Sequence, residues 1–321
     1  MTRYTGVTVF DGSVWHEHAS VAIADGRFVA DRGQQPVDLP GHAILPGFID
    51  AHVHLGLVDA ARVLRSGVTT VRDLGAPLGS LPTDGPRVLM AGQMLTARGG
   101  YPSRASWAPR GTAREVNDDP EQAVAEQKAA GACVIKVALE SHAGPLIEPA
   151  TLRAIVATAE PLRVTAHVSS LAMLERAIEA GVRELAHGLW SDEAIPASVI
   201  QEMVARGVTV VPTLHIDPSR ARIENLRRFH ESGGRIVYGT DMGNPPAAHG
   251  IDVDELRLMQ AAGMTLDEAL ASATSRAAAY LGSVCGRIEE GAPADLVIVG
   301  GDPRADLSVL ARPISVVRAS D

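Results

Sequence analysis

The chain has 321 residues, of which 46% are hydrophobic and 21% charged, so it can bury a large core and extended disorder is not expected. A formal net charge of −9 argues against nucleic acid and anionic membranes as partners. Its only cysteines, Cys133 and Cys285, exclude a disulfide framework and a thiolate zinc site. Residues 1–13 lack the apolar core of a signal peptide, and no apolar run is long enough to span a bilayer, which predicts a cytoplasmic protein.

Residues 1–45 are predicted to form short β-strands separated by turns. Asp11-Gly12 and Asp25-Gly26 are typical hairpin signals between runs that are rich in β-branched and aromatic residues. This segment therefore has β character, without the helical spacing that follows it.

Between residues 46 and 283 the sequence repeats a strand–helix pattern. Helical segments end in glycine and run directly into β-branched residues, as in RSGVTTVRD at 65–73 and ARGVTVVPTL at 205–214. Eight strands are predicted, near residues 48–54, 68–73, 87–95, 133–139, 163–168, 183–187, 208–214 and 235–241. Eight such units over this length predict an α/β fold of the (β/α)8 TIM-like barrel type. An open doubly wound sheet is the alternative, but it would need a glycine-rich phosphate turn or a similar signature that the sequence lacks.

The C-terminal residues return to β character, as in GRIEEGAPADLVIVGGDP at 286–303 and PISVVRAS at 313–320. Two β-rich ends on either side of a barrel suggest one small β-domain assembled from both. The predicted organisation is a β-domain of residues 1–45 plus 286–321 and a barrel of residues 46–285.

Polar side chains with metal-binding chemistry stand in five of the predicted strands, mostly at their ends. They are His52, His54, Lys136, His167, His187 and Asp241. Taken singly, each has an ordinary explanation, because a strand-end histidine is usually hydrogen-bonded or exposed, Lys136 could extend to solvent, and Asp241 could cap a helix. A barrel directs all six toward one point, however, and imidazole with carboxylate suits divalent ions such as Zn²⁺.

The chemistry of these residues divides them between two metal ions. His52 and His54 point to the same side of a strand, and with Asp241 they would hold one ion, whereas His167 and His187 would hold a second. A lysine ammonium group is a poor ligand beside two cations. A lysine carbamate formed with CO₂ would offer two anionic oxygens to bridge the ions, although composition alone does not show that conversion.

Longer motifs accompany these residues, namely ILPGFIDAHVH (44–54), GVTTVRDLG (67–75), VIKVA (134–138), TAHVSS (165–170), ELAHG (184–188), VVPTL (210–214), YGTDMG (238–243) and GRIEEGAPADLVIV (286–299). With them the chain resembles the metal-dependent amidohydrolase superfamily nearly end to end, and most closely its imidazolonepropionase-like and prolidase-like branch. The resemblance implies a β-sandwich built from both termini and a carboxylated Lys136 that bridges two divalent ions, usually Zn²⁺. It also implies that a hydroxide between the ions attacks a carbonyl while Asp241 takes its proton and passes it to the leaving group.

One loop departs from the pattern of that branch. Prolidase-like relatives often carry Gly-Gly-His after strand three, whereas TARGGYPSR has Tyr101 at the histidine position, over the expected site. Tyr101 and His215 are the preferred candidates for substrate contact because each follows a strand directly. Further candidates are Arg98, which could bind a carboxylate or could be a solvated loop arginine, and His142 and His249.

The favoured function is a binuclear metal-dependent hydrolase that cleaves an amide bond in a peptide-like compound, an N-acyl amino acid or a cyclic amide. The alternative is esterase, lactonase or phosphotriesterase activity at the same site. A deaminase is disfavoured because the strand-four lysine is present and the first glutamate after His167 is Glu175, eight residues on. A non-catalytic scaffold is disfavoured because all six ligands are kept. The expected partner is a small-molecule substrate, and a homo-oligomer stays open.

Overall fold

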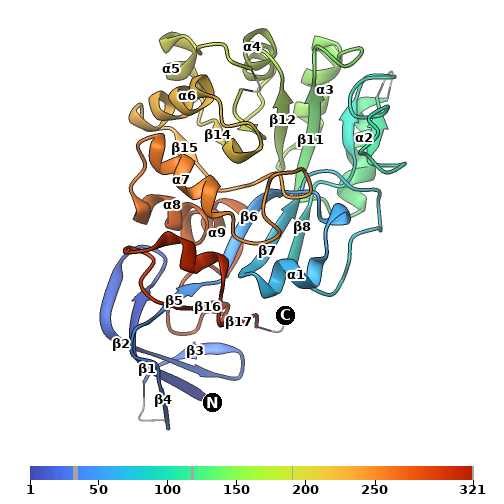
Figure 1. Cartoon of the computed structure of the whole chain (residues 1–321). Coiled ribbons are helices and arrows are strands. Elements are labelled where there is room, and N and C mark those ends of the chain that lie inside the picture. Colours follow the sequence, from blue (N-terminus) through green and yellow to red (C-terminus); the bar gives the residue numbers. More distant parts are fainter. Residues whose placement is uncertain (32–34, 117–118, 190, 320–321) are drawn as a thin grey trace.

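Eight parallel strands form a closed barrel in the computed structural model, which describes residues 1–31, 35–116, 119–189 and 191–319 (Figure 1). In chain order the barrel strands are β6 (Phe48–Val53), β7 (Val68–Asp73), β8 (Arg87–Met90) with β9 (Met94–Thr96), β11 (Val134–Leu139), β12 (Arg163–Val168), β13 (Glu184–Leu185), β14 (Thr209–Val210) and β15 (Arg235–Ile236). This confirms the predicted (β/α)8 TIM-like barrel.

The hydrogen bonds of the barrel run through two sheets and the junctions that join them. One sheet has the order β6-β7-β8, and the other contains β9-β11-β12-β13-β14-β15 with β10 (Ala113–Glu115) at its edge. The amide of Cys133, next to β11, donates to the carbonyl of Met90 on β8 at 2.8 Å. The amide of Ala51 on β6 donates to the carbonyl of Tyr238, just after β15, at 3.0 Å, so the barrel closes at both junctions between the sheets. The third strand, predicted as continuous over 87–95, is interrupted between β8 and β9.

Helices cover the outside of the barrel, as the glycine-terminated segments predict. They are α1 (Ala60–Arg65), α2 (Pro120–Ala129), α3 (Pro149–Ala159), α4 (Leu171–Glu179), α5 (Ala197–Ala205), α6 (Arg220–Glu231), α7 (Val253–Ala261), α8 (Leu266–Ser272) and α9 (Ser275–Leu281). In α4 the Ser170 hydroxyl accepts from the amide of Met173, and the apolar residues Leu174 and Ile178 face the barrel core. Within the described residues, no helix combines the length and apolar character needed to cross a membrane.

Both ends of the chain contribute to one sheet beneath the barrel (Figure 1). It contains β1 (Thr2–Phe10), β2 (Trp15–Ala24), β3 (Arg27–Val29), β4 (Pro36–Asp38), β5 (His42–Pro46), β16 (Leu296–Gly300) and β17 (Ser315–Val317). The strand β16 lies between β5 and β17 and is antiparallel to both. The predicted turns at Asp11-Gly12 and Asp25-Gly26 join β1 to β2 and β2 to β3.

The chain therefore has a β-domain formed by its two ends. The sequence boundaries, 1–45 with 286–321 against 46–285, stay a prediction, and residues 32–34, 117–118, 190 and 320–321 within these ranges lie outside the described part of the chain.

A buried ion pair lies inside the barrel. Both terminal nitrogens of Arg72 on β7 donate to Glu184 on β13, at 2.9 and 2.6 Å, and the side chains are 2% and 0% exposed. Arg72 Nε donates to the carbonyl of Ala51 at 2.9 Å, and the Tyr280 hydroxyl donates to Glu184 at 2.6 Å. This network ties α9 and three regions of the barrel wall together across its interior.

Candidate active site

The strand β6 brings two imidazoles to the carboxyl end of the barrel. His52 and His54 are both buried, and their ring centres lie 5.5 Å apart, as expected for alternate residues on one side of a strand. Gly239, in the segment after β15, packs against the backbone of His52, and a Cβ atom at this glycine would lie 3.0 Å from the His52 amide nitrogen. A glycine at this position therefore lets the segment after β15 pack directly against β6.

A tight turn after β15 places Asp241 beside these histidines. Its φ of +59° lies in the left-handed region, which non-glycine residues seldom adopt. The buried carboxylate of Asp50 holds the turn, because it accepts from the Thr240 hydroxyl at 2.6 Å and from the His52 amide at 3.0 Å. The Asp241 amide donates to the His52 carbonyl at 2.8 Å, so the two segments are fixed to each other at the site.

His52, His54 and Asp241 form a group that fits a divalent ion. One ligand atom from each lies within 4.8 Å of the others, and Asp241 Oδ1 is 3.3 Å from His52 Nε2 and 3.1 Å from His54 Nε2. His52 Nδ1 donates to the carbonyl of Ala186 at 2.6 Å, which leaves the lone pair on Nε2. In the part of the chain that the structure describes, His52 Nε2 and Asp241 Oδ1 are buried without a hydrogen-bond partner, as expected of metal ligands.

The charges of this group are set by its neighbours. Burial alone would raise the pKa of Asp241, but His52, His54 and Lys136 bring it down to about 2. Burial lowers the pKa of His52 well below its ordinary value. Asp241 is therefore an anion at neutral pH and His52 is a neutral imidazole, the forms in which both can bind a cation.

The other two predicted histidines continue the cluster across the barrel mouth. The ring centre of His187 lies 4.5 Å from that of His52 and 5.0 Å from that of His167. His187 Nδ1 is 3.1 Å from the Thr213 hydroxyl, and His167 Nε2 is 3.0 Å from Glu140 Oε2. The four imidazoles therefore form one continuous group.

Lys136 on β11 lies within reach of this group and is 1% exposed. Burial lowers its pKa from 10.5 to about 7, although Asp241 and Glu184 act in the opposite direction. A substantial share of the amine is thus neutral at physiological pH, and the neutral form is the nucleophilic one.

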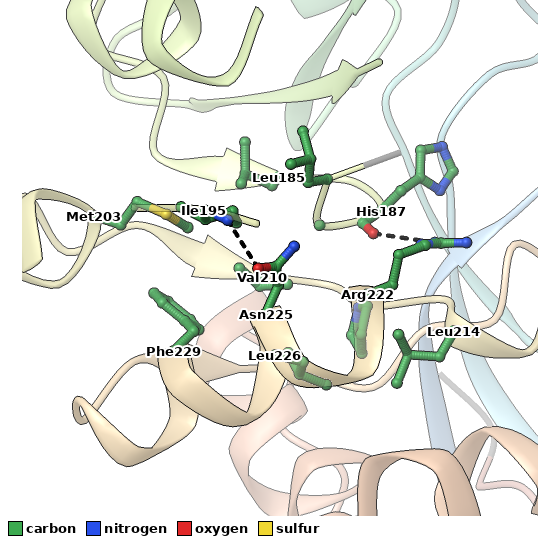
Figure 2. A pocket seen from close by; sticks show the side chains of 13 residues that line it. Leu185, His187, Ile195, Met203, Val210, Leu214, Arg222, Asn225, Leu226 and Phe229 are labelled. Carbon is green, nitrogen blue, oxygen red and sulfur yellow. Dashed lines mark hydrogen bonds between the residues drawn. The ribbon is translucent and has the colours of Figure 1, made fainter. Parts of the chain in front are cut away.

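His187 and its neighbours in the chain line one side of a small, mainly apolar cavity of about 20 Å³ (Figure 2). Leu185, Met203, Leu226 and other apolar side chains line this cavity, while the His187 ring points away from it. The guanidinium of Arg222 lies 3.5 Å from the His187 carbonyl oxygen. A space of this size between apolar side chains is too small for a substrate.

A separate cleft of about 430 Å³ opens onto His167, His187 and Asp241. Its described lining residues are Tyr101, Glu140, His142, Ala143, His167, His187, Ile216, Asp241 and Asn244. The loop after β9 covers part of it, since the Tyr101 ring lies 5.3 Å from that of His167 and the Trp107 ring lies 5.2 Å from that of His54. Burial raises the pKa of Tyr101 to about 12, so its phenol is neutral at physiological pH and can donate a hydrogen bond.

The predicted substrate-contact residues divide between this cleft and its surroundings. Tyr101 and His142 line the cleft, and the expectation that the loop around Tyr101 lies over the site agrees with the structure. Arg98 is exposed, His249 is half-buried, and neither is among the described lining residues. His215 turns its ring toward α7 instead.

The contacts of His215 are to the amino end of α7. Its Nδ1 lies 2.8 Å from Asp252 Oδ2, and its amide donates to Glu255 at 2.7 Å. Glu255 is fully buried, and burial raises its pKa from 4.5 to about 8. These residues make a polar support beside the cleft, whose wall includes the next residue in the chain, Ile216.

Sequence reasoning missed Glu140, Trp107 and Asn244. Glu140 could have been found, because alternate residues of a strand point to the same side and residue 140 is four positions after Lys136, which was predicted to face the barrel interior. Trp107 and Asn244 lie in loops, where strand periodicity gives no information about direction.

A closed parallel barrel with imidazole, carboxylate and buried amine groups at the carboxyl ends of its strands defines a metal-dependent barrel hydrolase. The model of the amidohydrolase family matches residues 43–319, and the chain belongs to that family. An uncharacterized protein of Mycobacterium tuberculosis strain H37Rv is 30% identical over 345 aligned positions, which cover 92% of this chain and 89% of that protein.

Solved structures agree with this assignment. A prolidase complexed with N-methylphosphonate-L-proline is 26% identical with a TM-score of 0.80, and the match covers 99% of this chain and 100% of that one. A Xaa-Pro dipeptidase with bound methionine is 24% identical with a TM-score of 0.83 over 99% of this chain and 98% of that one, which shows the shared fold. The resemblance to the prolidase-like branch is thereby confirmed.

Proposed function

We propose that this protein is a binuclear metal-dependent hydrolase that cleaves an amide bond in a peptide-like compound, an N-acyl amino acid or a cyclic amide. The observation that carries the proposal is the buried group of His52, His54 and Asp241, in which His52 Nε2 and Asp241 Oδ1 have no hydrogen-bond partner within the described residues and Asp241 lines the 430 Å³ cleft. A cleft of this volume suits a small molecule. Membership of the amidohydrolase family supports the reaction class.

The ligand set would be shared between two divalent ions, for which zinc is the expected metal. His52, His54 and Asp241 would hold one ion, and His167 and His187 the other. Once bound, the ions would supply the Lewis acidity that activates water and the substrate carbonyl.

Carboxylation of Lys136 would complete the ligand set. The neutral amine adds to CO₂, a new C–N bond forms, and one proton is released to give an anionic carbamate. Burial supports this step, because it favours the neutral amine over the ammonium form. The negative charge that results would offset part of the positive charge brought by two cations.

Asp241 is the proposed proton carrier. As an anion at neutral pH it can accept a proton from the attacking water on a carboxylate oxygen and then deliver it to the nitrogen of the leaving amine. The Tyr101 phenol and His142 stand at the cleft wall, where they can donate hydrogen bonds to substrate oxygens. The apolar surface of Trp107 and Tyr101 would exclude water from the covered side.

The proposal is tested by metal analysis and a substrate screen on the same preparation. Protein grown with added zinc should contain about two divalent ions per chain and should release amine from dipeptides, N-acyl amino acids or cyclic amides. Hydrolysis of lactones, aryl esters or phosphotriesters without any amide turnover would contradict amide hydrolysis and support the alternative, an esterase, lactonase or phosphotriesterase. Absence of bound metal would contradict a catalytic metal centre altogether.

A further inference from the structure

A second cleft, of about 390 Å³, lies at the opposite end of the barrel from the catalytic groups. Arg163 is the first residue of β12 and Arg235 is the first residue of β15, so both stand where strands begin. The described lining residues are Arg163, His230, Gly234, Arg235, Ile236, Val237, Met264, Arg276, Ala279 and Tyr280. This arginine cleft contains three arginines and, among its described lining residues, no carboxylate.

Two of the guanidinium groups converge on one aromatic ring. The guanidinium carbon of Arg163 lies 4.4 Å from the ring centre of Tyr280, and that of Arg235 lies 5.9 Å from the same point. Arg163 Nη1 donates to the Tyr280 carbonyl at 3.1 Å, which fixes the first guanidinium in place. These distances to one ring centre place the two guanidinium carbons at most about 10 Å apart, a separation at which like charges still repel, and the ring attracts each of them only weakly.

Within the described ranges, Arg276 is the one of these three arginines that has a carboxylate partner. It lies 4.0 Å from Glu268, which is also 3.6 Å from His230, whereas Arg163 and Arg235 form no ion pair with a carboxylate. Exposed arginines on an acidic protein normally pair with one of its many carboxylates or stand apart in solvent. Here three of them share one concave surface in a chain whose formal net charge is −9.

We propose that the arginine cleft binds a small organic dianion, recognised by its oxyanion groups. Guanidinium groups present planar pairs of donors that match phosphoryl, sulfonyl and carboxylate oxygens. The ligand's negative charge would relieve the repulsion between Arg163 and Arg235, and its organic body would contact Met264 and the Tyr280 ring. A polyanionic surface such as nucleic acid fits less well, because the strongly acidic chain repels it.

The probe for this site is benzene-1,3-disulfonate, which carries two oxyanion groups on a flat ring. Sulfonates are weak ligands for divalent ions, so binding to the metal centre would contribute little to the signal. Isothermal titration calorimetry of the metal-loaded protein should show saturable binding near one site per chain. The affinity should fall as sodium chloride is added, because exposed charges are screened.

Three variants distinguish binding in the arginine cleft from a general effect of removing positive charge. Arg235→Ala should weaken binding by about tenfold or more, since one guanidinium–oxyanion contact is lost, whereas Arg153→Ala on the exposed face of α3 should leave it unchanged. Arg235→Lys should retain part of the affinity. Hydrolytic activity and melting temperature without the probe should match the wild-type protein in all three variants.

Two outcomes would overturn the proposal. One is an affinity for the disulfonate that Arg235→Ala does not change, or that Arg153→Ala lowers equally, because the binding would then lie elsewhere. The other is no saturable binding to the wild-type protein at low salt. Arg163→Ala provides a second variant, and its melting temperature must be compared because Arg163 also packs on Tyr280.

Discussion

Replacing Glu184 by alanine should destabilise this protein far more than the same change at Glu224. In the barrel interior, the Glu184 carboxylate accepts hydrogen bonds from both terminal nitrogens of Arg72, at 2.9 and 2.6 Å. Glu224 makes a similar two-pronged contact with Arg227 on α6, at 2.8 and 2.5 Å, but the two side chains are 47% and 38% exposed. The two pairs thus share their chemistry and differ in burial.

The magnitude follows from what each change leaves behind. Glu184→Ala leaves the Arg72 guanidinium, 2% exposed, without its counter-charge, and an arginine does not escape the penalty by losing its proton. Breaking a buried pair in this way costs about 3–5 kcal/mol of unfolding free energy. The Tyr280 hydroxyl also loses its acceptor. Glu224→Ala removes an exposed pair that water solvates and salt screens, so it should cost little unfolding free energy.

The assay is urea unfolding followed by far-ultraviolet circular dichroism, at one pH and one zinc concentration for all variants. The double variant Arg72→Met with Glu184→Leu should recover most of the stability that Glu184→Ala loses, because no isolated charge remains inside the barrel. Unfolding free energies of Glu184→Ala and Glu224→Ala that differ by less than about 1 kcal/mol would contradict this prediction. A double variant less stable than Glu184→Ala would contradict it as well.

Four further changes test the site and its surroundings. Lys136→Ala should lower bound metal and turnover by about tenfold or more, with partial restoration by short carboxylic acids; unchanged metal content would remove its bridging role. Asp241→Asn should reduce kcat by about 10²–10⁴-fold without altering the circular dichroism spectrum, and a retained rate would exclude it as proton carrier. Tyr101→Phe should lower kcat/KM for the best amide substrate by up to about tenfold if its hydroxyl contacts substrate, measured by steady-state kinetics against the wild-type protein. Burial raises the folded-state pKa of Glu255 from 4.5 to about 8, so the stability present below pH 4.5 is lost as the pH rises through 8. The melting temperature of Glu255→Gln should therefore vary less with pH over this range than that of the wild-type protein. Parallel pH profiles of the two melting temperatures would contradict the raised pKa of Glu255.

The barrel was predictable because its signals are local and repeated. Five of the barrel strands follow a glycine that ends a helix, and a β-branched run then marks a buried parallel strand, as in 68–73 and 134–139. The interruption between β8 and β9 falls at Gly92, whose φ of +75° lies in the left-handed region, so this glycine was a signal that the prediction of one continuous strand did not use. Several predicted strands are also shorter than their apolar runs, as β14 shows.

The candidate site was predictable only as far as strand geometry determines side-chain direction. The six polar residues at strands could be brought together because a barrel aims its interior positions at one axis. In loops, strand geometry does not determine side-chain direction. Trp107 lies over the site, beside the His54 ring, whereas His215 points toward α7. The buried pair of Arg72 and Glu184 escaped notice because the two residues are 112 positions apart and each follows an ordinary strand pattern.

The position of β16 between β5 and β17 has a consequence for the order in which the chain folds during synthesis. Ile44 on β5 pairs with Ile298 on β16, a partner that leaves the ribosome about 250 residues later. Until then one edge of β5 has free backbone donors and acceptors, and its residues Ala43, Ile44 and Leu45 are apolar. The nascent protein thus carries an aggregation-prone edge throughout translation of the barrel, and the pairing of β16 with β5 is what removes it.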